Sequence, residues 1–147
     1  GSAGGHLAAV LGTVKDLRND DLSVPNAMIL FNPVLVFDPE KSDKWYAKAH
    51  FVGTDPLSLS PLHQITRSVP PTIIYHGTAD KTVPFASAER FHQAMLKAGL
   101  QSTLIPFKGR GHGFFNGGKH LQGSDYKRTL EYTDDFLREI AWLPLSI

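Results

Sequence analysis

The sequence contains no cysteine among its 147 residues. This absence excludes disulfides, thiolate catalysis and zinc sites built from cysteine. Neither sign of charge predominates, because the chain has 15 basic and 14 acidic residues and a formal net charge of +1. Such a balance gives no field that would attract nucleic acid or an anionic membrane, and no apolar run approaches the roughly 18 residues that a membrane span needs. We therefore expect neither nucleic acid nor a membrane as a partner.

The residues that are present suit one ordinary globular domain, with 41% hydrophobic and 20% charged residues. Three apolar runs, each bounded by turn residues, predict β-strands at 27–31, 72–76 and 102–107. The first run is continuous and closes on Asn32-Pro33, which is typical of a strand covered on both faces in a parallel sheet.

Helical periodicity separates and follows these strands. The predicted helices cover 3–17, a short stretch near 42–49, the segment from Pro84 to its C-terminal Gly99, and 124–140. In the last helix, the pattern predicts an inward stripe formed by Tyr126, Leu130, Thr133, Leu137 and Ile140. Strands that alternate with helices imply right-handed crossovers and a parallel sheet, so the expected fold class is α/β.

Two residues with catalytic potential follow predicted strands directly. Asp80 comes after the second strand and His112 after the third. Chemistry in a parallel sheet belongs at the carboxyl ends of its strands. Acyl transfer by a serine needs a hydroxyl, an imidazole that takes its proton and a carboxylate that orients the imidazole. Ser2, Asp80 and His112 provide these groups in the chain order serine, acid, histidine.

Three segments carry a family resemblance. Residues 1–8, GSAGGHLA, resemble the end of the G-x-S-A-G-G nucleophile elbow of α/β-hydrolase esterases, a group that includes acetyl, acetyl-xylan and feruloyl esterases and hormone-sensitive lipases. Residues 76–84 resemble the acid loop of these enzymes, and residues 111–114 resemble their histidine loop. Together the three segments and the spacing between them extend over essentially the whole chain.

The resemblance implies a fold, a reaction and a set of roles. The fold would be the C-terminal half of an α/β-hydrolase, with about three parallel strands flanked by helices. The reaction would be hydrolysis of a short-acyl carboxylic ester, with carbohydrate esters among the candidates, through an acyl-enzyme and without a cofactor. Ser2 would be the nucleophile, His112 the general base and Asp80 its orienting acid. The backbone N–H of Ala3 would contribute to the oxyanion hole. Asp55, which precedes Pro56, is a weaker rival for the acid.

The sequence also departs from the resembled pattern. The strands that would precede the elbow, and the loop that supplies further oxyanion donors, are not in it. We therefore interpret residues 1–147 as one partial α/β-hydrolase domain that is weakly active or inactive alone. The first strand would then have a bare edge that pairs with a second copy. The predicted homodimer contact consists of Ala27, Met28, Ile29, Leu30 and Phe31.

Other interpretations remain open at this point. The chain could derive from a serine peptidase of the prolyl oligopeptidase type, which shares this C-terminal layout, or it could be a non-catalytic assembled fragment. The segment 34–70 is either a small satellite core or a partial cap over the substrate. Trp45, Tyr46 and Phe114 are candidates for lining the substrate pocket. We expect no metal, because the histidines lack the spacing of known ligand motifs.

Overall fold

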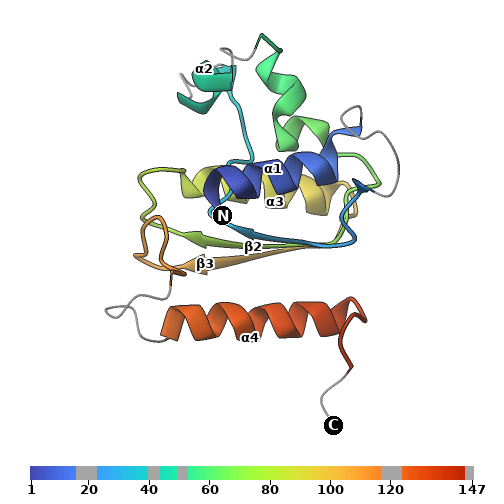
Figure 1. Ribbon diagram of the computed structural model, residues 1–147, viewed down its shortest axis with the longest axis vertical. Helices are drawn as coiled ribbons and strands as arrows, with labels where there is room; N and C mark the ends of the chain where they lie inside the picture. Colours follow the sequence, from blue (N-terminus) through green and yellow to red (C-terminus); the bar gives the residue numbers. More distant parts are fainter. Residues whose placement is uncertain (16–22, 40–43, 50–52, 117–123, 145–147) are drawn as a thin grey trace.

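The sheet of this protein has three parallel strands in the order β1-β2-β3. They are β1 (Met28–Phe31), β2 (Thr72–Gly77) and β3 (Ser102–Phe107), which confirms the predicted α/β fold with parallel strands. The computed structural model describes residues 1–15, 23–39, 44–49, 53–116 and 124–144 (Figure 1). Strand β2 lies in the centre and is buried along its whole length.

Helices cover both faces of this sheet. Figure 1 shows α1 and α3 on one face and α4 on the other. Their bounds are α1 (Ser2–Thr13), α2 (Lys44–Ala49), α3 (Phe85–Lys97) and α4 (Ser124–Glu139), with 3-10 turns η5 (Pro56–Leu59) and η6 (Pro61–Gln64). Residues 16, 17, 42 and 43, which the sequence also assigned to helices, lie outside the described residues. Pro84 is the N-cap of α3, and Gly99 follows its C-cap at φ +74°.

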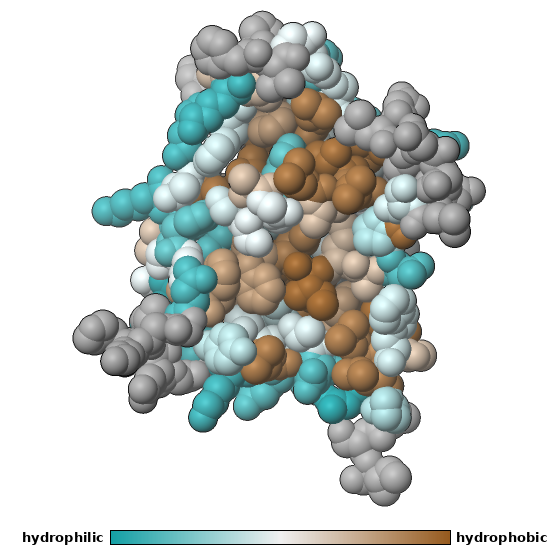
Figure 2. All heavy atoms as spheres, in the orientation of Figure 1, coloured by the Kyte–Doolittle hydropathy of each residue, from teal (hydrophilic) through white to brown (hydrophobic). Residues whose placement is uncertain are grey.

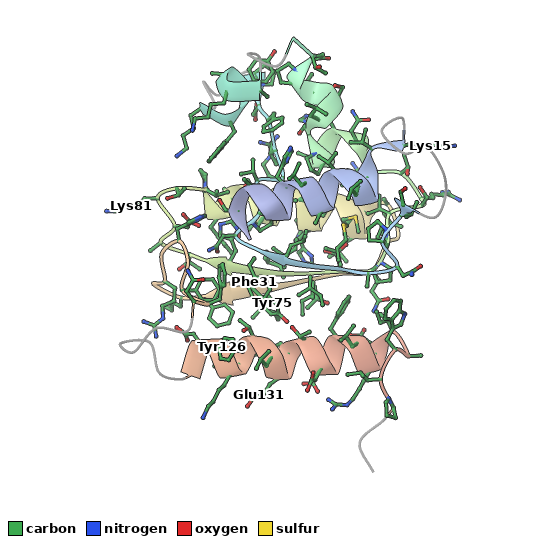
Figure 3. The ribbon with its side chains drawn as sticks, in the orientation of Figure 1. Lys15, Phe31, Tyr75, Lys81, Tyr126 and Glu131 are labelled. Atoms are coloured by element: carbon green, nitrogen blue, oxygen red, sulfur yellow. The ribbon has the colours of Figure 1, made fainter. Side chains whose placement is uncertain are left out.

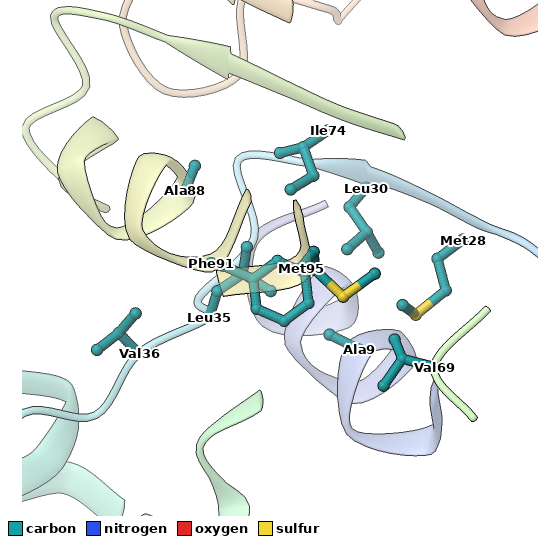
Figure 4. Packing of buried hydrophobic residues seen from close by; sticks show 10 residues of the cluster. All are labelled: Ala9, Met28, Leu30, Leu35, Val36, Val69, Ile74, Ala88, Phe91 and Met95. Atoms are coloured by element: carbon teal, nitrogen blue, oxygen red, sulfur yellow. The ribbon is translucent and has the colours of Figure 1, made fainter. Parts of the chain in front are cut away.

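Successive side chains of β2 point to opposite faces and anchor two separate cores. Ile74 packs on the face covered by α1 and α3, against Leu30 and Phe91 among others (Figure 4). Ile73 and Tyr75 pack on the other face with Phe136 of α4. Figure 3 shows Phe31 and Tyr75 pointing toward α4, and their ring centroids are 4.9 Å apart. The two cores fix α1, the sheet and α4 as three layers.

The structure confirms the second half of the predicted stripe of α4 and corrects the first half. Leu137 and Ile140 pack on the core that contains Phe136. Tyr126 and Leu130 are about half exposed, at 47% and 49%, and the buried residues in their part of the helix are Asp125 and Thr129. Two polar contacts hold the helix in this rotation: Asp125 pairs with Arg110, and Thr133 hydrogen-bonds to the Tyr75 hydroxyl at 2.8 Å. Apolar periodicity alone could not reveal that a buried carboxylate has a partner.

Strand β1 is one of the two edge strands of the described sheet, and β3 is the other. Its burial alternates, with Met28 and Leu30 buried and Ile29 exposed at 37%. The expectation of a strand covered on both faces is therefore wrong for Ile29, whose side chain is left partly uncovered on its face of the sheet.

The segment after β1 forms a small layer outside α1. Val34, Phe37 and Val83 make a buried cluster, and Trp45, Tyr46 and other partly buried side chains pack on it. A backbone hydrogen bond from Leu62 N to Leu35 O, 2.9 Å long, ties η6 to the chain that leaves β1. Residues 50–52 of this segment lie outside the described residues.

Candidate active site

The acid and the imidazole predicted from the sequence form a hydrogen-bonded pair. Asp80 follows β2 and His112 follows β3, and neighbouring parallel strands bring their carboxyl ends to the same edge. His112 Nδ1 lies 2.8 Å from Asp80 Oδ2. The Asp80 side chain is fully buried, whereas that of His112 is 29% exposed. Because a carboxylate can only accept, Nδ1 carries the proton, and Nε2 of the neutral ring is left as the basic nitrogen.

Asp80 is held by more than its imidazole partner. Its Oδ1 accepts backbone hydrogen bonds from Thr82 N at 2.8 Å and Val83 N at 2.9 Å. Burial raises the pKa of Asp80, but the hydrogen bonds from His112, Val83 and Thr82 outweigh it and bring the pKa below its ordinary value. The carboxylate is therefore charged at neutral pH and its orientation is fixed.

A second imidazole supports the acid from behind. His76 is completely buried at the end of β2, and its Nε2 donates to Val83 O at 3.0 Å. The same nitrogen lies 3.5 Å from Asp80 Oδ2. Burial lowers the pKa of His76, which favours the neutral ring. His76 thus anchors Val83, whose N–H in turn holds Asp80.

Backbone contacts join the loop of the acid to the loop of the histidine. Ala79 N donates to Arg110 O at 2.9 Å, and Gly109 N donates to the Thr78 hydroxyl at 2.9 Å. Gly77 is the closest point of the contact: a Cβ added there would stand 2.3 Å from Arg110 O. The absence of a side chain at Gly77 therefore lets the two loops approach closely enough for the Asp80–His112 hydrogen bond.

Substitution of Gly77 by alanine tests this contact. The new methyl group would press on backbone atoms that cannot yield cheaply, so we expect a loss of about 1–3 kcal/mol in the free energy of unfolding. Any ester hydrolysis should fall as well, because the histidine loop must move away from Asp80. Gly111→Ala is the matched control, since a Cβ there has no neighbour within 4 Å. Urea titration of both variants measures the difference; equal midpoints would contradict the argument.

Ser2 lies at the first position of α1, in a strained conformation. Its φ is +49°, which is uncommon for a residue with a side chain. Strain of this kind, placed just before a helix, is the geometry that exposes the hydroxyl in a nucleophile elbow. The preceding Gly1 lies against the histidine loop, since a Cβ on it would be 2.9 Å from Phe115 Cζ and 3.3 Å from Phe31 O. Figure 1 shows the N-terminus beside the edge where the strands end.

The link from the serine to the imidazole is not formed in this structure. Within the described part of the chain, no hydrogen bond joins Ser2 to His112. Catalytic hydrogen bonds without a substrate are often long and tighten only in the reacting complex. The structure thus brings Asp80 and His112 into contact and places Ser2 at the same edge, and its role as nucleophile stays a prediction.

The first turn of α1 offers backbone donors beside Ser2. The first hydrogen bond of the helix runs from Gly5 N to Gly1 O at 3.0 Å, so the N–H of Ala3 has no partner within the helix. An N–H group in this position points toward the space before the helix and can stabilise an anion. The prediction that Ala3 N–H belongs to an oxyanion hole is consistent with this position and is not tested by it.

Asn32 is a supporting residue that sequence reasoning missed. It is fully buried after β1 with φ +42°, and its Oδ1 accepts from Gly77 N at 3.2 Å. Its own N–H donates to Tyr75 O at 2.9 Å. The side chain therefore connects the ends of β1 and β2 next to the acid loop. The sequence signal, Asn-Pro after an apolar run, indicated only a turn.

The candidates for the substrate pocket have different surroundings. Trp45 lines a pocket of about 250 Å³ that reaches Ala3 and His6 at the start of α1. Tyr46 packs on the cluster below that pocket. Phe114 is only 6% exposed and packs on Phe107, with ring centroids 4.3 Å apart, so it is a core residue between the sheet and α4. Its aromatic character gave no way to distinguish core from pocket.

The structure gives no catalytic contact to Asp55 and no metal cluster among the described residues. Asp55, the rival acid, is exposed and caps η5 by accepting from Leu57 N at 3.1 Å. Within the described ranges, no group of three or more histidine, aspartate or glutamate side chains is arranged to hold a metal ion. The same part of the chain contains no helix of the length and apolarity that crossing a membrane requires.

Comparison with known proteins identifies the family. The prolyl oligopeptidase family matches residues 35–139, which include both Asp80 and His112. The chain belongs to this family. Its members share the α/β-hydrolase fold, and the resemblance stated from the sequence is thereby confirmed.

Esterases are among the relatives of this family member. An acetylxylan esterase of Xylanibacter ruminicola is 32% identical over 152 residues, covering 97% of this chain and 28% of that protein. The structure of a thermophilic esterase of Thermogutta terrifontis, Est2, is 46% identical with a TM-score of 0.86, covering 99% of this chain and 55% of that one. Est2 phosphonylated by sarin is 43% identical with a TM-score of 0.86, covering 99% and 57%. The chain thus spans about half of the esterase structure that it matches.

Proposed function

We propose that this chain carries the catalytic residues of a serine carboxylic-ester hydrolase that acts on short-acyl esters. The observation that carries the proposal is the buried Asp80–His112 pair at the edge where Ser2 begins α1 at positive φ. A charged acid behind an imidazole, with a strained serine close by, is the arrangement that generates a nucleophilic alkoxide.

The proposed reaction has two steps, acylation of Ser2 and hydrolysis of the resulting acyl-enzyme. Ser2 Oγ attacks the ester carbonyl while His112 Nε2 takes its proton. Asp80 keeps the proton on Nδ1 and stabilises the imidazolium that results. The N–H of Ala3 stabilises the oxyanion of the tetrahedral intermediate. His112 then protonates the leaving alcohol, and a water molecule activated by the same nitrogen releases the acyl group from Ser2.

The relatives support both the reaction and the size of the acyl group. Est2 is an esterase whose structures include forms with propionate and butyrate bound and forms phosphonylated by sarin. The proposal places the acyl group in the pocket of about 250 Å³ next to Ala3. The similarity to an acetylxylan esterase extends the proposal to acetyl esters of carbohydrates. The peptidase alternative rests on the family name alone.

A panel of substrates separates these possibilities. We expect the chain to hydrolyse p-nitrophenyl acetate and acetylated xylo-oligosaccharides, and to leave the amide of glycyl-prolyl-p-nitroanilide intact. Release of p-nitrophenol, acetate and p-nitroaniline measures the three reactions. Cleavage of the anilide faster than of the esters would favour the peptidase.

We also propose that the open edge of β1 pairs with a second copy of the chain. Figure 2 shows apolar side chains gathered on the face that carries α1 and this edge. Leu7, Leu11 and Ile29 are exposed there at 64%, 43% and 37%. Exposed strand edges beside apolar surface recruit another chain. Light scattering at micromolar concentration should give about twice the 16.2 kDa mass. Ile29→Lys should shift the mass toward the monomer, and a monomeric parent chain would refute the proposal.

A further inference from the structure

Two pockets of this protein share Trp45 as a lining residue. The near pocket, of about 250 Å³, is bounded by Ala3, His6 and Phe37. The far pocket, of about 360 Å³, is bounded by Val36, Val83 and Pro84 on the side of α3. Val34 and Trp45 line both pockets. These two side chains are therefore shared by the near pocket and the far pocket, and Trp45 is the larger of them.

The indole of Trp45 is held in place as a partition. It packs on the cluster of Val34, Phe37 and Val83. Two cations lie over its ring, Lys44 Nζ at 5.4 Å and Lys48 Nζ at 4.6 Å from the centroid. Cation–π contacts of this kind favour one ring orientation. α2, which carries Trp45, stands above the start of α1 (Figure 1).

The far pocket can take an alkyl chain. Its described walls are largely apolar. Two of its charged members pair, because Arg90 Nη1 lies 2.7 Å from Asp38 Oδ2, and the third, Lys44, has its Nζ over the Trp45 ring. The binding free energy that such a surface gives to an alkyl chain is roughly proportional to the apolar area removed from water.

We propose that Trp45 determines the acyl-chain specificity of this protein by separating the two pockets. The inference rests on the proposed function, in which the acyl group on Ser2 enters the near pocket beside Ala3. With Trp45 in place the chain must end at the indole. With a small residue at position 45 the near and far pockets join, and a longer acyl chain continues past Val34 into apolar surroundings.

Ester series test the proposal directly. The rates are measured as kcat/KM for p-nitrophenyl acetate, butyrate and octanoate. In Trp45→Ala and Trp45→Leu, we expect the octanoate-to-acetate ratio to rise at least tenfold, since each methylene buried in the joined pocket contributes about fourfold. Trp142→Ala is the matched control, because Trp142 is 57% exposed near the C-terminus and lines neither pocket. An unchanged ratio in both folded position-45 variants would overturn the proposal.

A binding measurement separates this inference from the catalytic one. Octanoate is titrated calorimetrically into Ser2→Ala and into the double variant Ser2→Ala/Trp45→Ala, neither of which can form an acyl-enzyme. Tighter binding of octanoate by the double variant, with butyrate binding equal in both, supports the partition even if no variant hydrolyses esters. Equal octanoate affinity in the two proteins would refute the partition, whatever the esterase assays show. Circular dichroism confirms that each variant is folded.

Discussion

Replacement of Ser2 by alanine is expected to reduce hydrolysis of p-nitrophenyl acetate to the rate seen without protein. The reason is that the reaction proposed here passes through an ester of Ser2, and no other group in the arrangement can form that intermediate. Loss of the serine in an enzyme of this kind costs on the order of 10⁶ in kcat, so whatever activity the chain has should disappear. Steady-state rates on matched protein preparations measure the effect.

Ser58→Ala is the control for the Ser2 substitution. The Ser58 hydroxyl donates to Asp55 O at 2.6 Å in the segment after β1, so it belongs to a local turn. Its replacement should leave the esterase rate unchanged. If Ser2→Ala retained the parental rate while both proteins were folded, the nucleophile would have to be another group.

Asp80→Asn is expected to lower kcat by about 10⁴ while leaving the fold intact. The amide oxygen can still accept from Thr82 N and Val83 N, so the acid loop keeps its shape. The amide nitrogen would then face His112 Nδ1 and donate to it, which moves the ring proton to Nε2. An imidazole with its proton on Nε2 cannot accept the proton of Ser2. Single-turnover kinetics with p-nitrophenyl acetate measure the acylation step.

Asp38→Asn is the matched control for Asp80→Asn, because it removes a carboxylate that pairs with Arg90 at 2.7 Å and is not in contact with His112. We expect Asp38→Asn to keep most of the acylation rate. Equal losses from the two substitutions would show that Asp80 acts only through stability, which thermal unfolding of both variants would also reveal.

The sequence predicted those parts of the protein that depend on local pattern. Short apolar runs bounded by turn residues gave β1, β2 and β3 nearly residue for residue. The positions of Asp80 and His112 directly after two of these strands predicted their proximity, because parallel strands end at one edge. The observed hydrogen bond of 2.8 Å between them agrees with that expectation.

Features that depend on tertiary partners could not be predicted in this way. The rotation of α4 follows from Asp125 meeting Arg110, a contact between residues on separate elements. The requirement for glycine at Gly77 follows from the approach of Arg110 O, and the role of Asn32 follows from its hydrogen bond to Gly77 N. Each of these contacts depends on how two separate elements pack together. The sequence pattern within either element therefore could not predict it.

The position of Trp45 is another such feature. A tryptophan in an irregular segment is equally compatible with a satellite core and with a substrate pocket. The structure places the ring on the cluster of Val34 and Phe37 and beside two pockets. Which pockets a side chain borders depends on tertiary packing, so no pattern in the sequence could predict it.

Labelling with a fluorophosphonate tests the central claim most directly, because the reagent forms a stable bond only with an activated nucleophile. The chain, Ser2→Ala and His112→Ala are each incubated with the probe, digested and analysed by peptide-mapping mass spectrometry. We predict that the probe mass appears on Ser2 of the parent chain and is lost or strongly reduced in both variants. A parent chain that stays unlabelled, or that carries the probe at a residue other than Ser2, would contradict the account.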